Sequence, residues 1–271
     1  MEISEGWNGD MYDGPDVYVK SFGNTVIDRI RYRIELGVYE ALYERECKWF
    51  KTPSLQGYDN NSLHIQLIQA RDGYNIYTRD VARALHEFNR VARYKNVNLY
   101  VSALSTVNHP TMSLIKLLRN SDVYSDAGLN VRECIKGYFG GLFRLERREC
   151  PSLIHNDVWE GNVIIDPSDD VYIIDYGNAY ITSRLYLFDL LYLCFDPETL
   201  SFRGDLLAFG MREYVSAGCD TSELDQQVMC FVIYRCLRYI ENNGGPYLCV
   251  KQVHYLNKVS GTAGGMAKWL H

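Results

Sequence analysis

Three side chains in one short stretch of the sequence have the types and spacing that phosphoryl transfer requires. Asp157 and Asn162 lie five residues apart across a loop that contains Gly161, and Asn162 begins an apolar segment. Asp175 closes a second apolar segment. If the two segments pair as short antiparallel strands, they bring two carboxylates and an amide to one place. Such a trio supplies oxygen ligands for Mg²⁺ and a carboxylate that can receive a hydroxyl proton.

The spacing of these residues is more informative than any one of them. The strands are predicted over residues 163–166 and 171–175, on either side of a turn-forming segment with one proline and two aspartates. His155 completes a His-x-Asp-x-x-x-x-Asn motif, and Asn162 precedes an Asp-Tyr-Gly sequence by thirteen residues. A single aspartate or asparagine is most often a turn former, and a single histidine is usually packed in the core. The hypothesis of a phosphoryl-transfer site therefore rests on the complete pattern.

This segment resembles the catalytic loop and metal-binding strand pair of the aminoglycoside phosphotransferase and choline kinase superfamily, whose members are relatives of protein kinases. His155-Asn-Asp157 and the following Glu-Gly-Asn162 resemble choline and ethanolamine kinases in particular, and Trp-Glu-Gly-Asn162 is also similar to fructosamine kinases. The resemblance implies that Asp157 is the catalytic base, that Asn162 and Asp175 bind the metal, and that His155 braces the loop. It also implies ATP or GTP and Mg²⁺ as cofactors.

The resemblance further implies a phosphate cover and an anchoring lysine in the N-terminal part. Gly6 and Gly9 resemble the glycine-rich turn between the first two strands, where missing side chains let backbone amides approach phosphate oxygens. Five residues precede Gly6, which predicts a short first strand. A turn sequence at residues 13–15 then predicts a hairpin into a β-rich segment that Lys20 ends. The family places at Lys20 the lysine that touches the α- and β-phosphates.

Glu35 is the candidate ion-pair partner of Lys20. It lies on a helix predicted from Thr25 to Tyr43, in which every fourth residue is apolar. Glu40 and Glu44 on the same helix are alternatives for this pair. Three arginines of the helix are interpreted as surface charge: Arg29, Arg31 and Arg33.

The order of predicted elements indicates an α+β fold that is bilobal and protein-kinase-like. The N-lobe is expected over residues 1–70 and the C-lobe over residues 71–271. Gln69, Ala70 and Arg71 match the hinge between such lobes, whose backbone groups would meet the adenine edge of a nucleotide. Further predictions are a strand at 63–69, helices at 80–93 and 131–147, a polar stretch between residues 96 and 130, and helical structure throughout after Leu185.

The overall composition is that of an ordinary globular protein. Hydrophobic residues make up 47% of the 271 residues, and 28 basic against 34 acidic side chains give a net charge of −6. This charge disfavours nucleic acid as a partner. The longest apolar runs, such as residues 228–234, are shorter than the roughly 18 residues of a membrane span. The N-terminus has no secretory signal pattern, and the eight cysteines have no CxxC spacing. We therefore expect a cytoplasmic protein with free thiols and no membrane partner.

The segment after Asp175 favours a small-molecule acceptor. A protein kinase needs a long activation segment as a platform for peptides. Here only thirteen residues, 176–188, separate Asp175 from the helix that begins at Asp189. Asp189 resembles the aspartate that small-molecule members of the superfamily carry at this position. Acidic residues outnumber basic ones on the expected acceptor side, which favours a cationic or neutral polar acceptor such as an amino sugar, an aminoglycoside, an amino alcohol or a choline-like compound. The acidic residues concerned are Glu198, Asp205, Glu213, Asp220, Glu223, Asp225 and Glu241.

Two alternatives remain at this stage. One is an atypical protein kinase that lacks the long activation segment. The other is a nucleotide-binding pseudokinase with a scaffold role, although the complete set of Lys20, Asp157, Asn162 and Asp175 argues against it.

Overall fold

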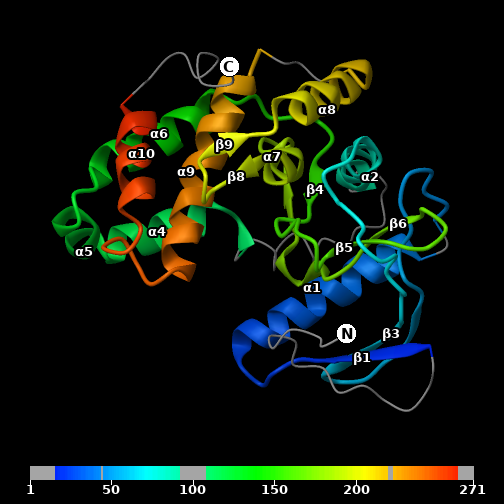
Figure 1. Ribbon diagram of the computed structural model, residues 1–271. Helices are drawn as coiled ribbons and strands as arrows, with labels where there is room; N and C mark the ends of the chain where they lie inside the picture. The colour runs from blue at the N-terminus through cyan, green and yellow to red at the C-terminus, as the bar shows by residue number, and fades with distance from the viewer. Residues whose placement is uncertain (1–15, 44, 92–107, 219–221, 262–271) are drawn as a thin grey trace.

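The computed structural model describes residues 16–43, 45–91, 108–218 and 222–261, and Figure 1 shows its course from the N-terminus in blue to the C-terminus in red. Four features predicted above lie outside these ranges, together with the short first strand: Gly6, Gly9, the turn at 13–15 and Glu44. In the described part, a small sheet with one long helix adjoins a larger, mostly helical region (Figure 1). This arrangement confirms the predicted α+β fold class.

A three-stranded antiparallel sheet forms the first part of the described chain. Its strand order is β1-β3-β2, so the last strand in sequence lies in the middle. Lys20 stands opposite Leu63 in the β1–β3 register. β3 ends three residues before the predicted end because its pairing with β1 stops at Gln66, and β2 was not predicted. The strands are β1 (Val17–Ser21), β2 (Leu55–Tyr58) and β3 (Ser62–Gln66).

Helix α1 (Val26–Leu42) is the long helix of this part, and it matches the predicted helix to within one residue at each end. A capping box starts it: the hydroxyl of Thr25 accepts a hydrogen bond from the backbone N–H of Asp28, and the Asp28 carboxylate accepts one from the backbone of Thr25. Its apolar stripe is buried at Ile34, Val38 and Leu42, whereas Val26 at the start of the helix is exposed. Glu35 lies on the buried side as well, with no exposed surface.

Two short strand pairs hold the motif residues in place. In the first, β5 (Val163–Ile165) pairs antiparallel with β6 (Val171–Ile173), as the sequence predicted. The turn between them is fixed by the Asp166 carboxylate, which accepts hydrogen bonds from two backbone N–H groups at 2.8 and 2.9 Å. In the second, β4 (Ser152–Ile154) pairs with β7 (Tyr180–Thr182). The catalytic-loop candidate therefore runs from the end of β4 to the start of β5.

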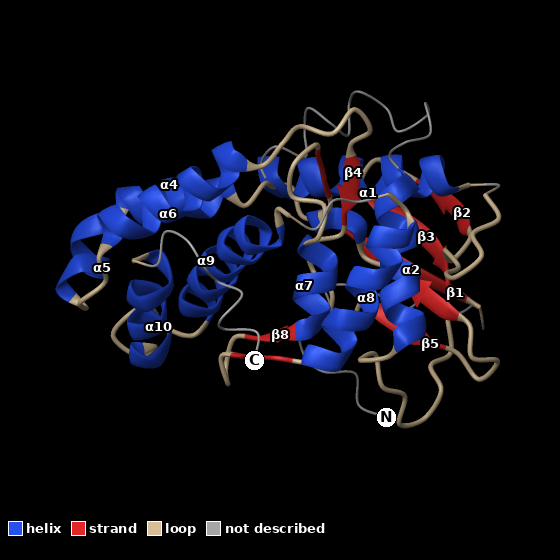
Figure 2. Ribbon diagram, turned by 90° about the horizontal axis from the view of Figure 1, so that it is seen from above, coloured by secondary structure: helices blue, strands red, loops and turns tan. Residues whose placement is uncertain are grey.

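The remaining elements are mainly helices that pack in two groups. Helices α2, α7 and α8 contact one another next to the strand pairs, whereas α6, α9 and α10 contact one another farther from the sheet (Figure 2). In the described ranges, no helix is both long enough and apolar enough to cross a membrane. The helices are α2 (Arg79–Arg90), α4 (Thr111–Arg119), α5 (Ser121–Asp126), α6 (Val131–Arg144), α7 (Phe188–Cys194), α8 (Gly204–Ser216), α9 (Leu224–Asn242) and α10 (Val250–Ser260).

One expectation about these elements was wrong. The chain after Leu185 is not helical throughout, because β8 (Phe195–Asp196) and β9 (Ser201–Phe202) form a strand pair between α7 and α8. Pro197 lies in the turn between them, where it cannot continue a helix. Helices α4 and α5 lie within the stretch that was described as polar, and they contact α9 and α6.

The connection from β3 to α2 spans residues 67–78. We propose that the boundary between the two lobes falls within it, near residue 70 as the sequence predicts.

Candidate active site

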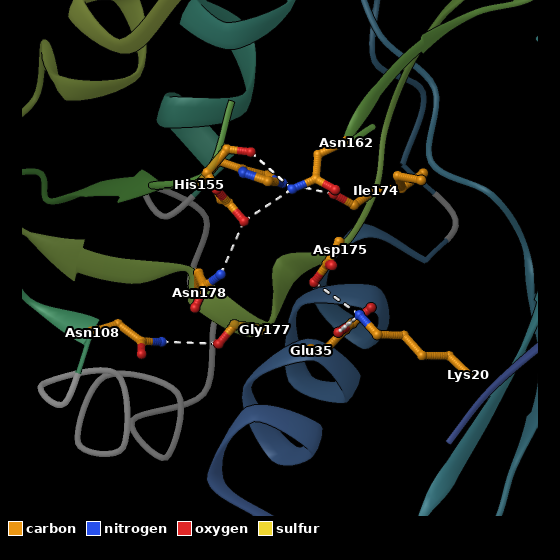
Figure 3. Close-up of polar contacts among 10 residues, drawn as sticks. Lys20, Glu35, Asn108, His155, Asn162, Ile174, Asp175, Gly177 and Asn178 are labelled. Carbon is orange, nitrogen blue, oxygen red and sulfur yellow. Dashed lines mark hydrogen bonds and ion pairs between the residues drawn. The ribbon is translucent and has the colours of Figure 1, made fainter. Parts of the chain in front are cut away.

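The structure brings Lys20, Glu35 and Asp175 together in one ion cluster (Figure 3). The Lys20 ammonium donates to Glu35 Oε2 at 2.7 Å and lies 2.8 Å from Asp175 Oδ1. Glu35 is fully buried, whereas the Asp175 side chain is 26% exposed. Of the two alternatives to Glu35, Glu40 is exposed and Glu44 lies outside the described residues.

Burial and charge have opposite effects on the pKa values of this cluster. Burial lowers the pKa of Lys20, but the carboxylates of Glu35 and Asp175 outweigh it, so the pKa is raised and the ammonium stays charged. Burial raises the pKa of Glu35 to about 7 against the lowering effect of Lys20. Burial also raises the pKa of Asp175, but Lys20 outweighs it and the net pKa is lowered. Asp175 therefore remains an anionic oxygen ligand near neutral pH.

Asp157 is held by neutral hydrogen-bond donors. Its Oδ2 accepts from Asn162 Nδ2 at 3.2 Å and from Asn178 Nδ2 at 3.1 Å. Its Oδ1 accepts a longer bond of 3.3 Å from the Tyr192 hydroxyl. Burial raises the pKa of Tyr192, so this phenol keeps its proton and acts as a donor. The carboxylate is thus fixed in orientation, and Oδ1 keeps a lone pair for a further proton.

Asn162 and Asp175 fit the donor set of a magnesium ion. Asn162 Nδ2 also donates to the backbone carbonyl of Asp157 at 2.9 Å, and this leaves Asn162 Oδ1 buried without a hydrogen-bond partner. An orphaned amide oxygen beside an ionised carboxylate is what a hard, oxygen-preferring cation requires. In the ranges that the structure describes, no group of three or more His, Cys, Asp or Glu residues could hold a metal. A cation here would therefore take its other ligands from phosphate and water, as Mg²⁺ usually does.

A buried network braces the loop that carries Asp157. Asp189, at the start of α7, accepts hydrogen bonds from the backbone N–H groups of His155 and Asn156 at 2.8 and 2.9 Å, and from Asn89 Nδ2 at 2.7 Å. His155 Nε2 donates to the carbonyl of Ile174 at 2.7 Å and so ties the loop to the end of β6 (Figure 3). Asp189 thus positions the loop backbone from a fully buried site.

Asp175 leaves its strand in a left-handed conformation, with φ of 60°. Few residues other than glycine adopt this conformation, and such strain is typical of functional sites. The next residue, Tyr176, is fully buried and packs against Tyr39, Phe88 and His155, so the core holds the strained residue in place. The predicted strand therefore ends at Ile173, two residues before Asp175.

A cavity of about 320 Å³ contains the predicted base, metal ligands and lysine in its lining. Lys20, Glu35, Asp157, Asn162 and Asp175 all face it. A larger open hollow of about 660 Å³ lies between residues 45–49 and helices α2 and α8, and it shares no lining residue with this site.

The predicted hinge residues Gln69, Ala70 and Arg71 do not line this cavity. The Arg71 backbone N–H donates to the carbonyl of Ile165 at 2.8 Å, and its guanidinium pairs with Asp169. Arg71 therefore fastens the β3–α2 connection to the β5–β6 pair, and its N–H is not free for a purine. The adenine contacts of Gln69 and Ala70 stay a prediction.

The structure brings to the site four residues for which the sequence did not predict these contacts. Asn178 and Tyr192 hold Asp157, Trp159 lines the cavity with 46% of its surface exposed, and Arg31 lines it from α1. Asn178 stands three residues after Asp175, so its place in the motif could have suggested it. The others could not be found from spacing because they depend on how α1, α7 and the loop pack.

Comparison with solved structures places the fold among antibiotic phosphotransferases. The chain superimposes on a ternary complex of APH(2")-IIa with streptomycin and ATP with a TM-score of 0.63 and 16% identity, over 94% of this chain and 90% of that one. For APH(2")-Ib with ADP the TM-score is 0.62 at 15% identity, with 95% and 91% covered. For the macrolide 2'-phosphotransferase MphH from Brachybacterium faecium it is 0.52 at 9% identity, with 94% and 87% covered.

These similarities confirm the fold that the sequence resemblance implied. No model of a known protein family matches the sequence, and no curated protein sequence matches it either.

Proposed function

We propose that this protein is a magnesium-dependent phosphotransferase that moves the γ-phosphoryl group of ATP or GTP to a hydroxyl of a small molecule. The observation that carries the proposal is the joint lining of one cavity by Lys20, Asp157, Asn162 and Asp175 in a fold of this class. Solved structures of similar fold contain ATP, ADP or GDP, which supports a nucleotide as phosphoryl donor.

Each residue has a distinct part in the proposed reaction. Lys20, held by Glu35 and Asp175, would bind the nucleotide phosphates. Asn162 Oδ1 and the Asp175 carboxylate would hold Mg²⁺, which supplies charge neutralisation for the phosphates when bound. Asp157 Oδ1 would accept the proton of the acceptor hydroxyl as that oxygen bonds to phosphorus and the bond from phosphorus to the leaving diphosphate breaks. The proton ends on Asp157 and the phosphoryl group on the acceptor.

The segment after Asp175 supports a small acceptor over a protein. It contains the single turn Tyr176–Asn178, the short strand β7 and then α7, without a run long enough for a peptide platform. Trp159 presents a flat apolar surface at the cavity, which suits the face of a ring-shaped polyol.

Within the predicted cationic or neutral polar classes, we favour a neutral polyol. Two of the seven acidic residues behind the cationic prediction form ion pairs elsewhere: Glu213 pairs with Arg83, and Glu241 pairs with Lys116 and Arg238. Asp220 lies outside the described residues.

A positive charge lies near the base instead. The guanidinium of Arg235 stacks 4.1 Å from the ring centre of Tyr192, whose hydroxyl contacts Asp157. The Nε atom of Arg235 is buried without a hydrogen-bond partner. An acceptor ammonium group close to Tyr192 would be repelled by this guanidinium. Initial rates on a panel of neutral sugars, amines and sugar acids test this choice, and faster phosphorylation of the amines would overturn it.

The fate of label from γ-labelled ATP tests the proposed function. Wild-type protein with Mg²⁺ and a pool of small hydroxyl compounds should place label on a small molecule, whereas Asp157→Asn should not. Label on protein would instead support the atypical protein kinase, and nucleotide binding without any transfer would support the pseudokinase.

A further inference from the structure

Arg31 lines the same cavity as Asp157 and Asp175. It lies one helical turn before Glu35 on α1, so the two side chains share a face of the helix. The alternating arginines of this helix were interpreted together as surface charge. All three side chains are exposed, as expected, and Arg31 alone among them also lines the cavity.

The backbone at Gly177 brings Arg31 close to the metal-ligand candidate. A Cβ atom at this glycine would lie 3.5 Å from Arg31 Cβ, 3.5 Å from Asp175 Oδ1 and 3.3 Å from Glu35 Oε2. Gly177 is itself held by Asn108, whose Nδ2 donates to its carbonyl at 2.9 Å (Figure 3). Because Gly177 has no side chain, α1 can approach the Asp-Tyr-Gly segment closely. This packing fixes the Cβ atom of Arg31 near Asp175.

The charges around the cavity indicate an anionic ligand for Arg31. Lys20 is already compensated by two carboxylates, Glu35 and Asp175. Among the described residues, no Asp or Glu forms an ion pair with Arg31. A magnesium–triphosphate complex remains anionic, so it would need a further cation at this end of the cavity. A guanidinium suits this purpose because its planar fork matches phosphate oxygens.

We propose that Arg31 binds the γ-phosphoryl group of the nucleotide and stabilises the negative charge on it during transfer. This inference rests on the proposed function. Arg31 takes no part in proton transfer, because the proton of the acceptor hydroxyl goes to Asp157. The bond from phosphorus to the bridging oxygen breaks and the bond to the acceptor oxygen forms, with Arg31 contacting the phosphoryl oxygens that take part in neither bond.

Binding measurements can isolate this contact without any turnover. We would titrate Mg·ADP and a magnesium complex of the non-hydrolysable β,γ-imido analogue of ATP into wild type and Arg31→Gln by calorimetry. The variant should bind the analogue about tenfold more weakly, since a charge-assisted bond is lost, and bind ADP within about twofold of wild type. Arg29→Gln is the matched control, because it removes the same charge from the same helix outside the cavity, and it should change neither affinity.

Phosphate release from ATP to water provides the kinetic readout. Arg31→Gln should lower the rate of this hydrolysis at saturating ATP by at least about tenfold. The rate of Arg31→Lys should lie between those of wild type and Arg31→Gln, because lysine keeps the charge but lacks the planar guanidinium fork. Equal loss of ADP and analogue affinity, or loss of neither, would overturn the role of Arg31 while leaving the proposed function intact. If wild type binds neither nucleotide, the proposed function fails and this inference fails with it.

Discussion

The proposed nucleotide side and the proposed acceptor side of the cavity hold their functional side chains in different ways. On the nucleotide side, Lys20 is fixed by ion pairs with Glu35 and Asp175. On the acceptor side, Asp157 is fixed by two amides and a phenol, all of them neutral. Lys20 therefore contacts groups of opposite full charge, whereas the three donors to Asp157 carry no charge.

This contrast suits the two tasks of a phosphotransferase. A triphosphate needs a permanent cation, and the paired carboxylates keep the pKa of Lys20 raised. A base that must take up a proton is better held by neutral donors, since a cation paired directly with it would stabilise the carboxylate and weaken it as a base.

The largest effect is expected at the base. Asp157→Asn keeps the shape of the side chain but cannot accept the hydroxyl proton, so the turnover number should fall by about 10²–10⁴-fold. Nucleotide affinity should stay within about twofold, because Asp157 belongs to the acceptor side. Steady-state kinetics and calorimetry on the same preparation check both, and an unchanged turnover number would remove Asp157 from the mechanism.

The next effect is expected at the metal ligands. Asp175→Ala should weaken Mg·ATP binding by about 10- to 100-fold, since it removes an anionic ligand and one partner of Lys20. Asn162→Ala should weaken it less, because a neutral amide oxygen binds a hard cation less strongly. Titrations of ATP with and without Mg²⁺ distinguish a loss of metal binding from a loss of phosphate binding. Equal Mg·ATP affinity in wild type and Asp175→Ala would place the metal elsewhere.

A smaller effect is expected at the phenol that holds the base. Tyr192→Phe removes the 3.3 Å bond to Asp157 Oδ1 and keeps the ring against Arg235. The turnover number should fall by about fivefold, because one long hydrogen bond contributes about 1 kcal/mol. The KM for nucleotide should not change. A rise in that KM with an unaltered turnover number would show that Tyr192 does not act through Asp157.

The smallest effect is a pH dependence on the nucleotide side. Burial raises the pKa of Glu35 from 4.5 to about 7, so the carboxylate that pairs with Lys20 is increasingly deprotonated as the pH rises through 7. Nucleotide affinity should therefore rise a few-fold between about pH 6 and pH 8. Glu35→Gln cannot titrate and should bind more weakly with a flatter profile. An identical profile in wild type and variant would contradict this assignment.

The fold and the central residues of the site could be predicted because their signal is local. Asp157, Asn162 and Asp175 are spaced by one loop and one strand pair, and α1 has a regular apolar stripe with a capping box. Local spacing and periodicity are what a sequence preserves most directly.

The rest depends on contacts between distant segments. Tyr192 reaches Asp157 from 35 positions along the chain, and Arg31 meets Gly177 only because α1 packs against the Asp-Tyr-Gly segment. The acidic residues counted after Leu190 favoured a cationic or neutral polar acceptor, but none of those that the structure describes lines the cavity, and Glu213 and Glu241 pair with basic neighbours. Net charge along a segment does not reveal which side chains face a cavity.

The most direct test of the central claim is a mass-spectrometric screen of a metabolite extract. Wild type and Asp157→Asn would each be incubated with the extract, ATP and Mg²⁺, and the two product profiles compared. At least one polar hydroxyl compound should gain a single phosphoryl group with wild type and not with Asp157→Asn. Equal gains with both proteins, or no gain with a wild type that binds Mg·ATP, would contradict this claim.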